Sequence, residues 1–287
     1  MKMRKILCLA LAAILPAMLF GCSAPATNND PNPATTVPTE PAPSDPKTYK
    51  VLFIGNSYTN TTMPDLFKQF ATAAGYNVEV ESVVKNSWEL TLFADPTDTY
   101  GKQVNAHLTG DNQYDFVVLQ EKSILTATPE LPKFYTAVRN LNARIEAAGA
   151  KTILYSTWGR KTGSAALPQY GLTNESMTWK VASAYKAIGE ELDIPVAYVG
   201  LAFYDIFTST QILDVYDSDL THPSYEGNYL SAATLFATMF QVDPTNVAFN
   251  GKLPADQAAL LKEAARKAVF ETPEIPEQYK TSSEGIG

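Results

Sequence analysis

The stretch KVLFIGNS, residues 50–57, decides how the folded part of this chain is interpreted. The consecutive apolar residues 51–54 are typical of a strand that is buried on both faces, as in a parallel sheet. A glycine and a serine soon after such a strand indicate a tight turn that can present the serine hydroxyl to solvent. The stretch therefore predicts a parallel sheet and a candidate nucleophile, Ser57, although Gly-Asn-Ser is also an ordinary turn sequence.

Short apolar runs alternate with segments of helical periodicity along the rest of the chain. Strands are expected at residues 50–54, 78–84, 116–119, 152–155 and 195–199. Helices are expected at about residues 64–75, 134–148, 177–192, 229–240 and 260–268. Strands separated by helices imply right-handed crossovers and a mainly parallel five-stranded sheet with helices on both faces. We therefore expect one α/β domain over residues 49–272, followed by an irregular tail over 273–287.

A second candidate stretch, DLTHP at residues 219–223, lies near the other end of the chain. His222 is the better candidate for a general base, because the other histidine, His107, lies on a short polar segment and is expected at the surface. An aspartate three residues earlier, Asp219, can hydrogen-bond the far ring nitrogen and orient the imidazole toward a serine. Asp217 is a rival orienting carboxylate with a less natural spacing, and a helix-capping loop is the alternative interpretation of the stretch.

Taken together, the early Gly-x-Ser turn and the late Asp-x-x-His-Pro stretch resemble the SGNH, or GDSL-like, hydrolase superfamily, in a bacterial lipoprotein branch with Gly-Asn-Ser in place of Gly-Asp-Ser. The resemblance spans the whole predicted domain, but its specificity depends on these two motifs. It implies a flavodoxin-like three-layer sandwich and a Ser-His-Asp triad that hydrolyses esters, often acyl groups on carbohydrates and lipids. Ser57 would be the nucleophile, His222 the base and Asp219 its orienting partner, with no metal or organic cofactor.

The middle motifs depart from the pattern of that family. The family usually takes one oxyanion donor from a glycine after the second strand, where this chain has KNSW at residues 85–88. Another donor is usually an asparagine after the third strand, where QEKS at residues 120–123 is closer to sialate O-acetylesterase relatives. The oxyanion donors implied by the resemblance are Ser57, Asn86, Ser87 and Gln120. Losing one such donor typically lowers turnover by about 100- to 1000-fold, so a non-catalytic glycan-binding protein on the same fold is the alternative.

Trp158 and Arg160 follow the fourth predicted strand and would face the same cleft. An indole can stack on a sugar or line an acyl site, and a guanidinium can bind an anionic substrate. Both are therefore candidate substrate-binding residues, with core packing for Trp158 and a solvated surface position for Arg160 as the alternatives.

The first 22 residues have the pattern of a secretion signal. Basic residues within 1–5 precede an apolar run over 6–20, which is too short to span a bilayer. The following LFGC, residues 19–22, resembles a bacterial lipobox, which implies a signal peptide over 1–21 and a lipidated Cys22. A plain signal peptide cut elsewhere or an uncleaved anchor helix are the alternatives.

A proline-rich segment over residues 23–48 follows the signal. With so few large apolar side chains it cannot bury enough surface to offset its ordering entropy, so residues 22–48 are expected to be a lipidated tether. This predicts an extracytoplasmic location on a bacterial membrane, at the cell surface or in the periplasm. An adhesion lipoprotein is a further alternative, supported only by the tether.

The composition of this 287-residue chain argues against some classes of binding partner. Its 22 Lys and Arg against 30 Asp and Glu give a formal net charge of −8, which argues against a nucleic-acid partner. Its two cysteines both lie in the first 22 residues, so neither a disulfide framework nor a Cys-rich zinc site is expected. The expected partners are an acylated glycan or other ester substrate and, through the lipid anchor, a membrane.

Overall fold

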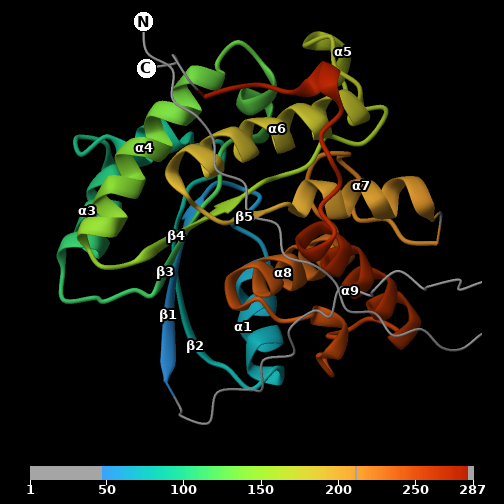
Figure 1. The fold of residues 1–287 in the computed structure, drawn as a ribbon, viewed down its shortest axis with the longest axis horizontal. Coiled ribbons are helices and arrows are strands. Elements are labelled where there is room, and N and C mark those ends of the chain that lie inside the picture. The colour runs from blue at the N-terminus through green and yellow to red at the C-terminus, as the bar shows by residue number, and fades with distance from the viewer. Residues whose placement is uncertain (1–46, 211, 284–287) are drawn as a thin grey trace, which may run out of the picture. The chain divides into compact units, whose positions relative to one another are not determined.

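A computed structural model describes residues 47–210 and 212–283. The predicted signal peptide, Cys22 and the tether up to residue 46 lie outside these residues. The five strands form an all-parallel sheet in the order β2-β1-β3-β4-β5 (Figure 1). They are β1 (Thr48–Gly55), β2 (Asn77–Val84), β3 (Phe116–Leu119), β4 (Lys151–Tyr155) and β5 (Val196–Ala197).

Helices and short 3-10 turns connect the strands. The helices are α1 (Met63–Ala73), α2 (Leu90–Ala94), α3 (Thr99–Thr109), α4 (Leu131–Ala147), α5 (Ala166–Gln169), α6 (Asn174–Leu192), α7 (Val199–Ser209), α8 (Tyr225–Phe240) and α9 (Ala255–Phe270). The 3-10 turns are η1 (Ser123–Ala127), η2 (Pro244–Asn246) and η3 (Glu277–Tyr279). Within residues 47–210 and 212–283, no helix combines the length and the apolar character needed to cross a membrane.

The apolar run of β1 supplies two separate cores. Val51 and Phe53 pack with α1, α7, α8 and α9, whereas Leu52 and Ile54 pack with α2, α3, α4 and α6. Figure 1 shows α3 and α4 on one side of the sheet and α1 and α8 on the other. The unbroken apolar run is needed because side chains alternate between the two faces of a strand and both faces are covered. The predicted three-layer α/β fold is confirmed.

Helices α2, α3, α5 and α7 were not expected from the sequence. Helix α7 begins at Val199, inside the predicted fifth strand, and shortens that strand to Val196–Ala197. Its buried residues Val199, Ala202, Phe203 and Ile206 recur at helical spacing, but they directly continue the apolar run that was assigned to the strand. Helix α3 has few buried residues, so its sequence shows too few apolar positions to reveal a helical pattern. The tail from residue 273 to 283 contains η3 and otherwise no helix or strand.

His107 lies in the last turn of α3, a helix with few buried residues. Its Nδ1 is 2.6 Å from the hydroxyl of Tyr114, which in turn donates to Glu81 at 2.8 Å. The imidazole is only 25% exposed. His107 is therefore partly buried and partnered at the helix end, not the surface residue that was expected.

The strand order places the loops that follow β1 and β3 side by side, at the carboxyl ends of these two strands. The chain leaves β1 toward β2 on one side and returns to β3 on the other, so β1 and β3 are neighbours whose outgoing connections diverge. In open parallel sheets the crevice at such a switch point, beyond the carboxyl ends of the strands, is the usual ligand site. The loops that follow β1 and β3 carry Ser57 and Gln120.

Candidate active site

Ser57 lies on the turn that directly follows β1, with its side chain partly exposed. The turn closes when the N–H of Thr59 donates to the carbonyl of Asn56 at 3.0 Å. A Cβ on Gly55 would lie 2.6 Å from both Gln120 Oε1 and Thr59 Oγ1, so only glycine fits there. The close approach of these side chains fixes the backbone below Ser57 and leaves its hydroxyl at the opening of the crevice.

The imidazole of His222 joins Ser57 to Asp219. His222 Nε2 lies 2.9 Å from Ser57 Oγ, although the two residues are far apart in the sequence. On the other side of the ring, Nδ1 is hydrogen-bonded to Asp219 Oδ2. The second oxygen of Asp219 accepts from the backbone N–H groups of Thr221 at 2.9 Å and His222 at 2.8 Å. These contacts form a continuous Asp-His-Ser hydrogen-bonded line.

The carboxylate of Asp219 is held in its charged form. Partial burial opposes ionisation, but the hydrogen bonds from the His222 ring and from the two backbone N–H groups outweigh it and lower the pKa of Asp219. A carboxylate acceptor beside Nδ1 favours the tautomer in which Nδ1 carries the proton and Nε2 is free to accept one. This is the arrangement required for removing the proton of the Ser57 hydroxyl.

The rival carboxylate, Asp217, does not reach the imidazole ring. Its side chain accepts from the N–H of Ser218 at 2.6 Å, and its backbone N–H donates to the carbonyl of His222 at 2.8 Å. Asp217 therefore closes the loop that carries His222, and the structure brings Asp219 to the ring nitrogen.

Contacts from the loop after β4 fix the His222 loop from the other side. Leu220 adopts a left-handed conformation with φ of 62°, and its carbonyl accepts from the N–H of Lys161 at 2.9 Å. The indole N–H of Trp158 donates to the carbonyl of Thr221 at 3.0 Å. The position of His222 is thus set by the chain that follows β4.

The expectation that Trp158 binds substrate is contradicted by its surroundings. The indole is fully buried, stacked between Tyr58 at 4.5 Å and Phe203 at 4.1 Å between ring centroids. Because both faces are covered, no sugar ring can stack on it. Trp158 instead supports the His222 loop through its N–H.

The turn after β2 presents unpaired backbone N–H groups beside Ser57. It is closed by a hydrogen bond of 3.1 Å from the N–H of Trp88 to the carbonyl of Lys85, and Ser87 has φ of 65°. This is the left-handed region, which costs a non-glycine residue roughly 1–2 kcal/mol. Ser87 therefore holds a backbone conformation that glycine reaches without this cost.

Side chains connect this turn to the Ser57 turn. Asn60 donates to Asn86 at 3.0 Å, and the amide of Asn56 donates to the carbonyl of Trp88 at 3.1 Å. Among the hydrogen bonds of the described residues, none uses the backbone N–H of Ser57, Asn86 or Ser87. These three N–H groups remain candidate oxyanion donors.

Gln120 was expected to be an oxyanion donor, and the structure contradicts this. The residue is 1% exposed. Oε1 accepts from the N–H of Asn56 at 2.8 Å and from the hydroxyl of Thr59 at 3.0 Å. Nε2 donates to Asn56 Oδ1 at 3.0 Å and to the carbonyl of Glu121. Since both amide hydrogens are engaged, Gln120 positions the turn that carries Ser57 and has no hydrogen left for an oxyanion.

Glu121, directly after it, is a buried carboxyl group that the sequence analysis did not single out. Burial raises its pKa to about 8, against the opposing effect of the N–H groups of Lys122 and Leu90, which donate to it at 2.6 and 3.2 Å. Its own N–H donates to the hydroxyl of Tyr185 at 3.0 Å. A polar pair directly after an apolar strand was the available signal, but it does not show which partners the pair binds.

Tyr58 was also missed. Its ring meets the His222 ring edge-on, with centroids 5.5 Å apart and an interplanar angle of 84°. Its hydroxyl accepts from Ser123 at 3.3 Å. Burial raises the pKa of Tyr58, while Ser123 and the charge of Arg160 oppose the rise. Arg160, a predicted substrate-binding residue, is thus placed beside the Tyr58 hydroxyl and is partly exposed.

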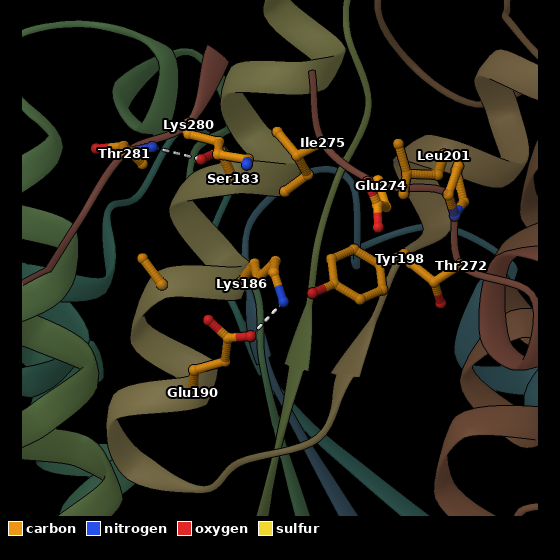
Figure 2. Close-up of a pocket in the computed structure, with 12 residues that line it drawn as sticks. Ser183, Lys186, Glu190, Tyr198, Leu201, Thr272, Glu274, Ile275, Lys280 and Thr281 are labelled. Atoms are coloured by element: carbon orange, nitrogen blue, oxygen red, sulfur yellow. Dashed lines mark hydrogen bonds and ion pairs between the residues drawn. The ribbon is translucent and has the colours of Figure 1, made fainter. Parts of the chain in front are cut away.

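A separate cavity of about 570 Å³ lies between α6, Tyr198 and the tail residues 272–281. Figure 2 shows Lys186 paired with Glu190 along α6, and the Tyr198 hydroxyl directed toward Lys186. None of its lining residues belongs to the Ser57, His222 and Asp219 line. Three of its charged lining residues are already paired, because Lys186 binds Glu190 and Lys280 binds Glu277.

No family model and no curated protein sequence matches the chain. Among solved structures, it is similar to a proposed SGNH hydrolase from Slackia heliotrinireducens, with 28% identity and a TM-score of 0.60 over 67% of this chain and 100% of that one. A DUF4886 family protein from Bacteroides uniformis gives 17% identity and a TM-score of 0.67 over 80% and 98%. A protein named TesA gives 15% and 0.50 over 66% and 97%. The described chain therefore has an SGNH hydrolase-like fold.

Proposed function

We propose that this protein is a serine ester hydrolase that works by two-step acyl transfer. The observation that carries the proposal is the continuous line from Asp219 through His222 to Ser57, with 2.9 Å between Nε2 and Oγ. A nucleophile, a base within hydrogen-bond reach and a group that orients the base are the parts that acyl transfer needs. The SGNH hydrolase-like fold supports the same interpretation.

In the first step, Ser57 Oγ attacks the ester carbonyl carbon while His222 Nε2 takes the hydroxyl proton. The carbonyl oxygen becomes an oxyanion, which the free N–H groups of Ser57 and Ser87 are available to bind. His222 then gives its proton to the leaving alcohol, and an acyl-Ser57 ester remains. Asp219 stabilises the imidazolium throughout and keeps its orientation.

In the second step a water molecule takes the place of the alcohol. His222 removes a proton from the water as its oxygen attacks the acyl carbon, and a second oxyanion forms in the same place. The proton returns to Ser57 Oγ as the acid leaves, which restores the starting state.

The substrate is proposed from the sequence rather than from a pocket. The signal peptide and the lipidated Cys22 would hold the domain outside the cytoplasm, where acyl and O-acetyl esters on carbohydrate or cell-wall polymers are available. The exposure of the reacting residues supports a polymeric substrate, because the side chains of His222 and Asp219 are 37% and 48% exposed.

A non-catalytic glycan-binding lipoprotein is the second candidate, and one observation favours it. Gln120 cannot supply an oxyanion donor, so the hole would consist of backbone N–H groups alone. Loss of one donor costs about 100- to 1000-fold in turnover. A protein that binds glycans without hydrolysing them does not need this donor.

Turnover of 4-nitrophenyl acetate and of an acetylated oligosaccharide separates the two candidates. An esterase releases acetate from both, and Ser57→Ala abolishes the release while the protein stays folded. Saturable oligosaccharide binding without acetate release by the wild type would support the binding protein and overturn the esterase.

A further inference from the structure

Arg160 is a charged residue whose environment gives it no counter-ion. Its Nε is buried and has no hydrogen-bond partner, and within residues 47–210 and 212–283 no carboxylate forms an ion pair with its guanidinium. Partial burial of an unpaired charge is unfavourable. An unsatisfied group of this kind in a well-packed region calls for a physical reason.

Two other arginines of the described residues have carboxylate partners: Arg139 binds Glu191, and Arg266 binds Glu263 and Glu271. The remaining one, Arg144, also has no ion pair within the described residues, but it donates to the carbonyl of Ala94 and to the side-chain oxygen of Asn105. The neighbouring cation, Lys161, is also neutralised, because it pairs with Asp214. Arg160 is thus an unpaired cation next to a paired one.

The backbone around Arg160 is fixed, so its position is not that of a loose surface side chain. The amide of Asn174 donates to the carbonyl groups of Arg160 and Gly159 at 2.9 and 3.1 Å. A Cβ on Gly159 would lie 2.3 Å from the carbonyl oxygen of Asn174, so the two segments are in direct contact. A fixed backbone reduces the entropy lost when the guanidinium binds a partner.

Tyr58 connects Arg160 with the reacting residues. Its hydroxyl lies beside the guanidinium, and its ring packs edge-on against His222. Asp219 also acts on the Tyr58 hydroxyl through its charge, but its oxygens are occupied by the imidazole and by two backbone N–H groups. Arg160 is therefore a cation that borders the Ser57 site without taking part in its hydrogen-bonded line.

We propose that Arg160 binds a carboxylate carried by the ester substrate, so that the enzyme prefers esters with an anionic group close to the scissile bond. This inference rests on the proposed esterase function and names its substrate class. A guanidinium matches a carboxylate through two parallel N–H···O bonds, a geometry that lysine cannot provide. The carboxylate belongs either to the acyl part, as in a dicarboxylic acid half-ester, or to the alcohol part, as in an acetylated uronic acid.

Paired substrates test the proposal and distinguish the two sources. Mono-(4-nitrophenyl) succinate against 4-nitrophenyl acetate tests the acyl part, and an O-acetylated hexuronic acid against the matching O-acetylated hexose tests the alcohol part. For each pair, the measured quantity is kcat/KM of the anionic substrate divided by kcat/KM of the neutral one. We expect Arg160→Gln to lower this ratio by about 10- to 100-fold for one of the two pairs, which is the usual effect of losing a charge-assisted hydrogen bond.

Two further variants show whether carboxylate binding needs the two parallel N–H groups of a guanidinium or only a positive charge. Arg160→Lys keeps the charge and should recover only part of the ratio. Lys161→Gln removes the adjacent cation that is already paired with Asp214, and the ratio should stay at the wild-type value. Thermal unfolding of each variant establishes that the fold is intact.

A binding measurement keeps the inference separate from the esterase proposal. Ser57→Ala should bind the anionic member of the preferred pair more tightly than the neutral member in calorimetry, and Ser57→Ala with Arg160→Gln should lose that difference. Equal ratios in wild type and Arg160→Gln, or equal affinities in Ser57→Ala, would overturn the carboxylate site. Absence of hydrolysis with selective carboxylate binding would overturn the esterase and retain the site.

Discussion

The residues that carry the proposed chemistry and the residues beneath them differ in their access to solvent. The side chains of His222 and Asp219 are 37% and 48% exposed, whereas Gln120 and Glu121 are 1% and 0% exposed. Besides its own line to Ser57, the exposed pair contacts two backbone N–H groups of its own loop and the ring of Tyr58. The buried pair binds backbone N–H groups of the loop that follows β1 and of the first residue of α2.

This difference separates chemistry from positioning. Exposed reacting groups can be replaced at little cost in stability, because water solvates what remains. Buried polar groups cannot, since each removed partner leaves another group unsatisfied in the interior. Substitutions of His222 and Asp219 should therefore lower activity with little loss of stability, whereas substitutions of Gln120 and Glu121 should change stability.

His222→Ala should have the largest effect on activity, because it removes the base from the line to Ser57. Removing one member of such a unit costs about 10⁴- to 10⁶-fold in kcat. The midpoint of thermal unfolding should shift little, since the ring is partly exposed. Steady-state hydrolysis of 4-nitrophenyl acetate checks the first expectation, and an unchanged rate would break the assignment of His222.

Asp219→Asn should come next, with a loss of about 10³- to 10⁴-fold in kcat, because the amide no longer fixes the reactive imidazole tautomer. Asp217→Asn is the matched control two residues earlier. It retains the backbone contacts and should leave kcat within about twofold, since its carboxylate does not touch the ring. A larger loss of kcat for Asp217→Asn than for Asp219→Asn would mean that Asp217, and not Asp219, orients the imidazole.

Gln120→Leu should lower both activity and stability. The change leaves the N–H and side-chain oxygen of Asn56 without their buried partner, at a cost of about 2–4 kcal/mol in the free energy of unfolding. Displacement of the Ser57 turn should also reduce kcat by about 10- to 100-fold. Urea unfolding measures the first effect, with exposed Gln113→Leu as the control; unchanged stability would show that Gln120 does not support the turn.

Glu121→Gln should change the pH dependence of stability. Burial raises the pKa of Glu121 from 4.5 to about 8, so the folded state holds this proton more tightly than the unfolded state does. The contribution of the protonated carboxyl is therefore full below about pH 4.5 and is lost as the pH rises to about 8. Urea unfolding between pH 5 and pH 9 should show a flatter profile for Glu121→Gln. An unchanged slope would mean that Glu121 titrates in its ordinary range.

The sequence predicted the parts of this molecule that depend on local pattern. The apolar run of β1 indicated a strand covered on both faces, and Val51 and Leu52 do face separate cores. Ser57 and His222 were selected by their positions after a strand and before a helix, and the structure brings them within 2.9 Å. Helix α7 was missed because its first residue, Val199, had been assigned to the strand that it directly follows, and the helical spacing of Val199, Ala202 and Phe203 was not used.

The failures concern residues whose role depends on what they touch. Gln120 has the chemistry of a donor, but both of its amide hydrogens are used by Asn56 and Glu121, which lie on other parts of the turn region. Trp158 has the chemistry of a sugar platform, but Tyr58 and Phe203 cover its two faces. Side-chain type indicates what a residue can do, whereas only tertiary packing shows which of its groups are free.

The central claim is that His222 activates Ser57, and labelling with a fluorophosphonate tests it most directly. Intact-mass spectra of the wild type should show a single covalent adduct, which peptide mapping places on Ser57. Ser57→Ala and His222→Ala should both lose it, while Asp217→Asn should be labelled like the wild type. A well-folded wild type that takes up no reagent, or an adduct that persists in Ser57→Ala, would contradict the account.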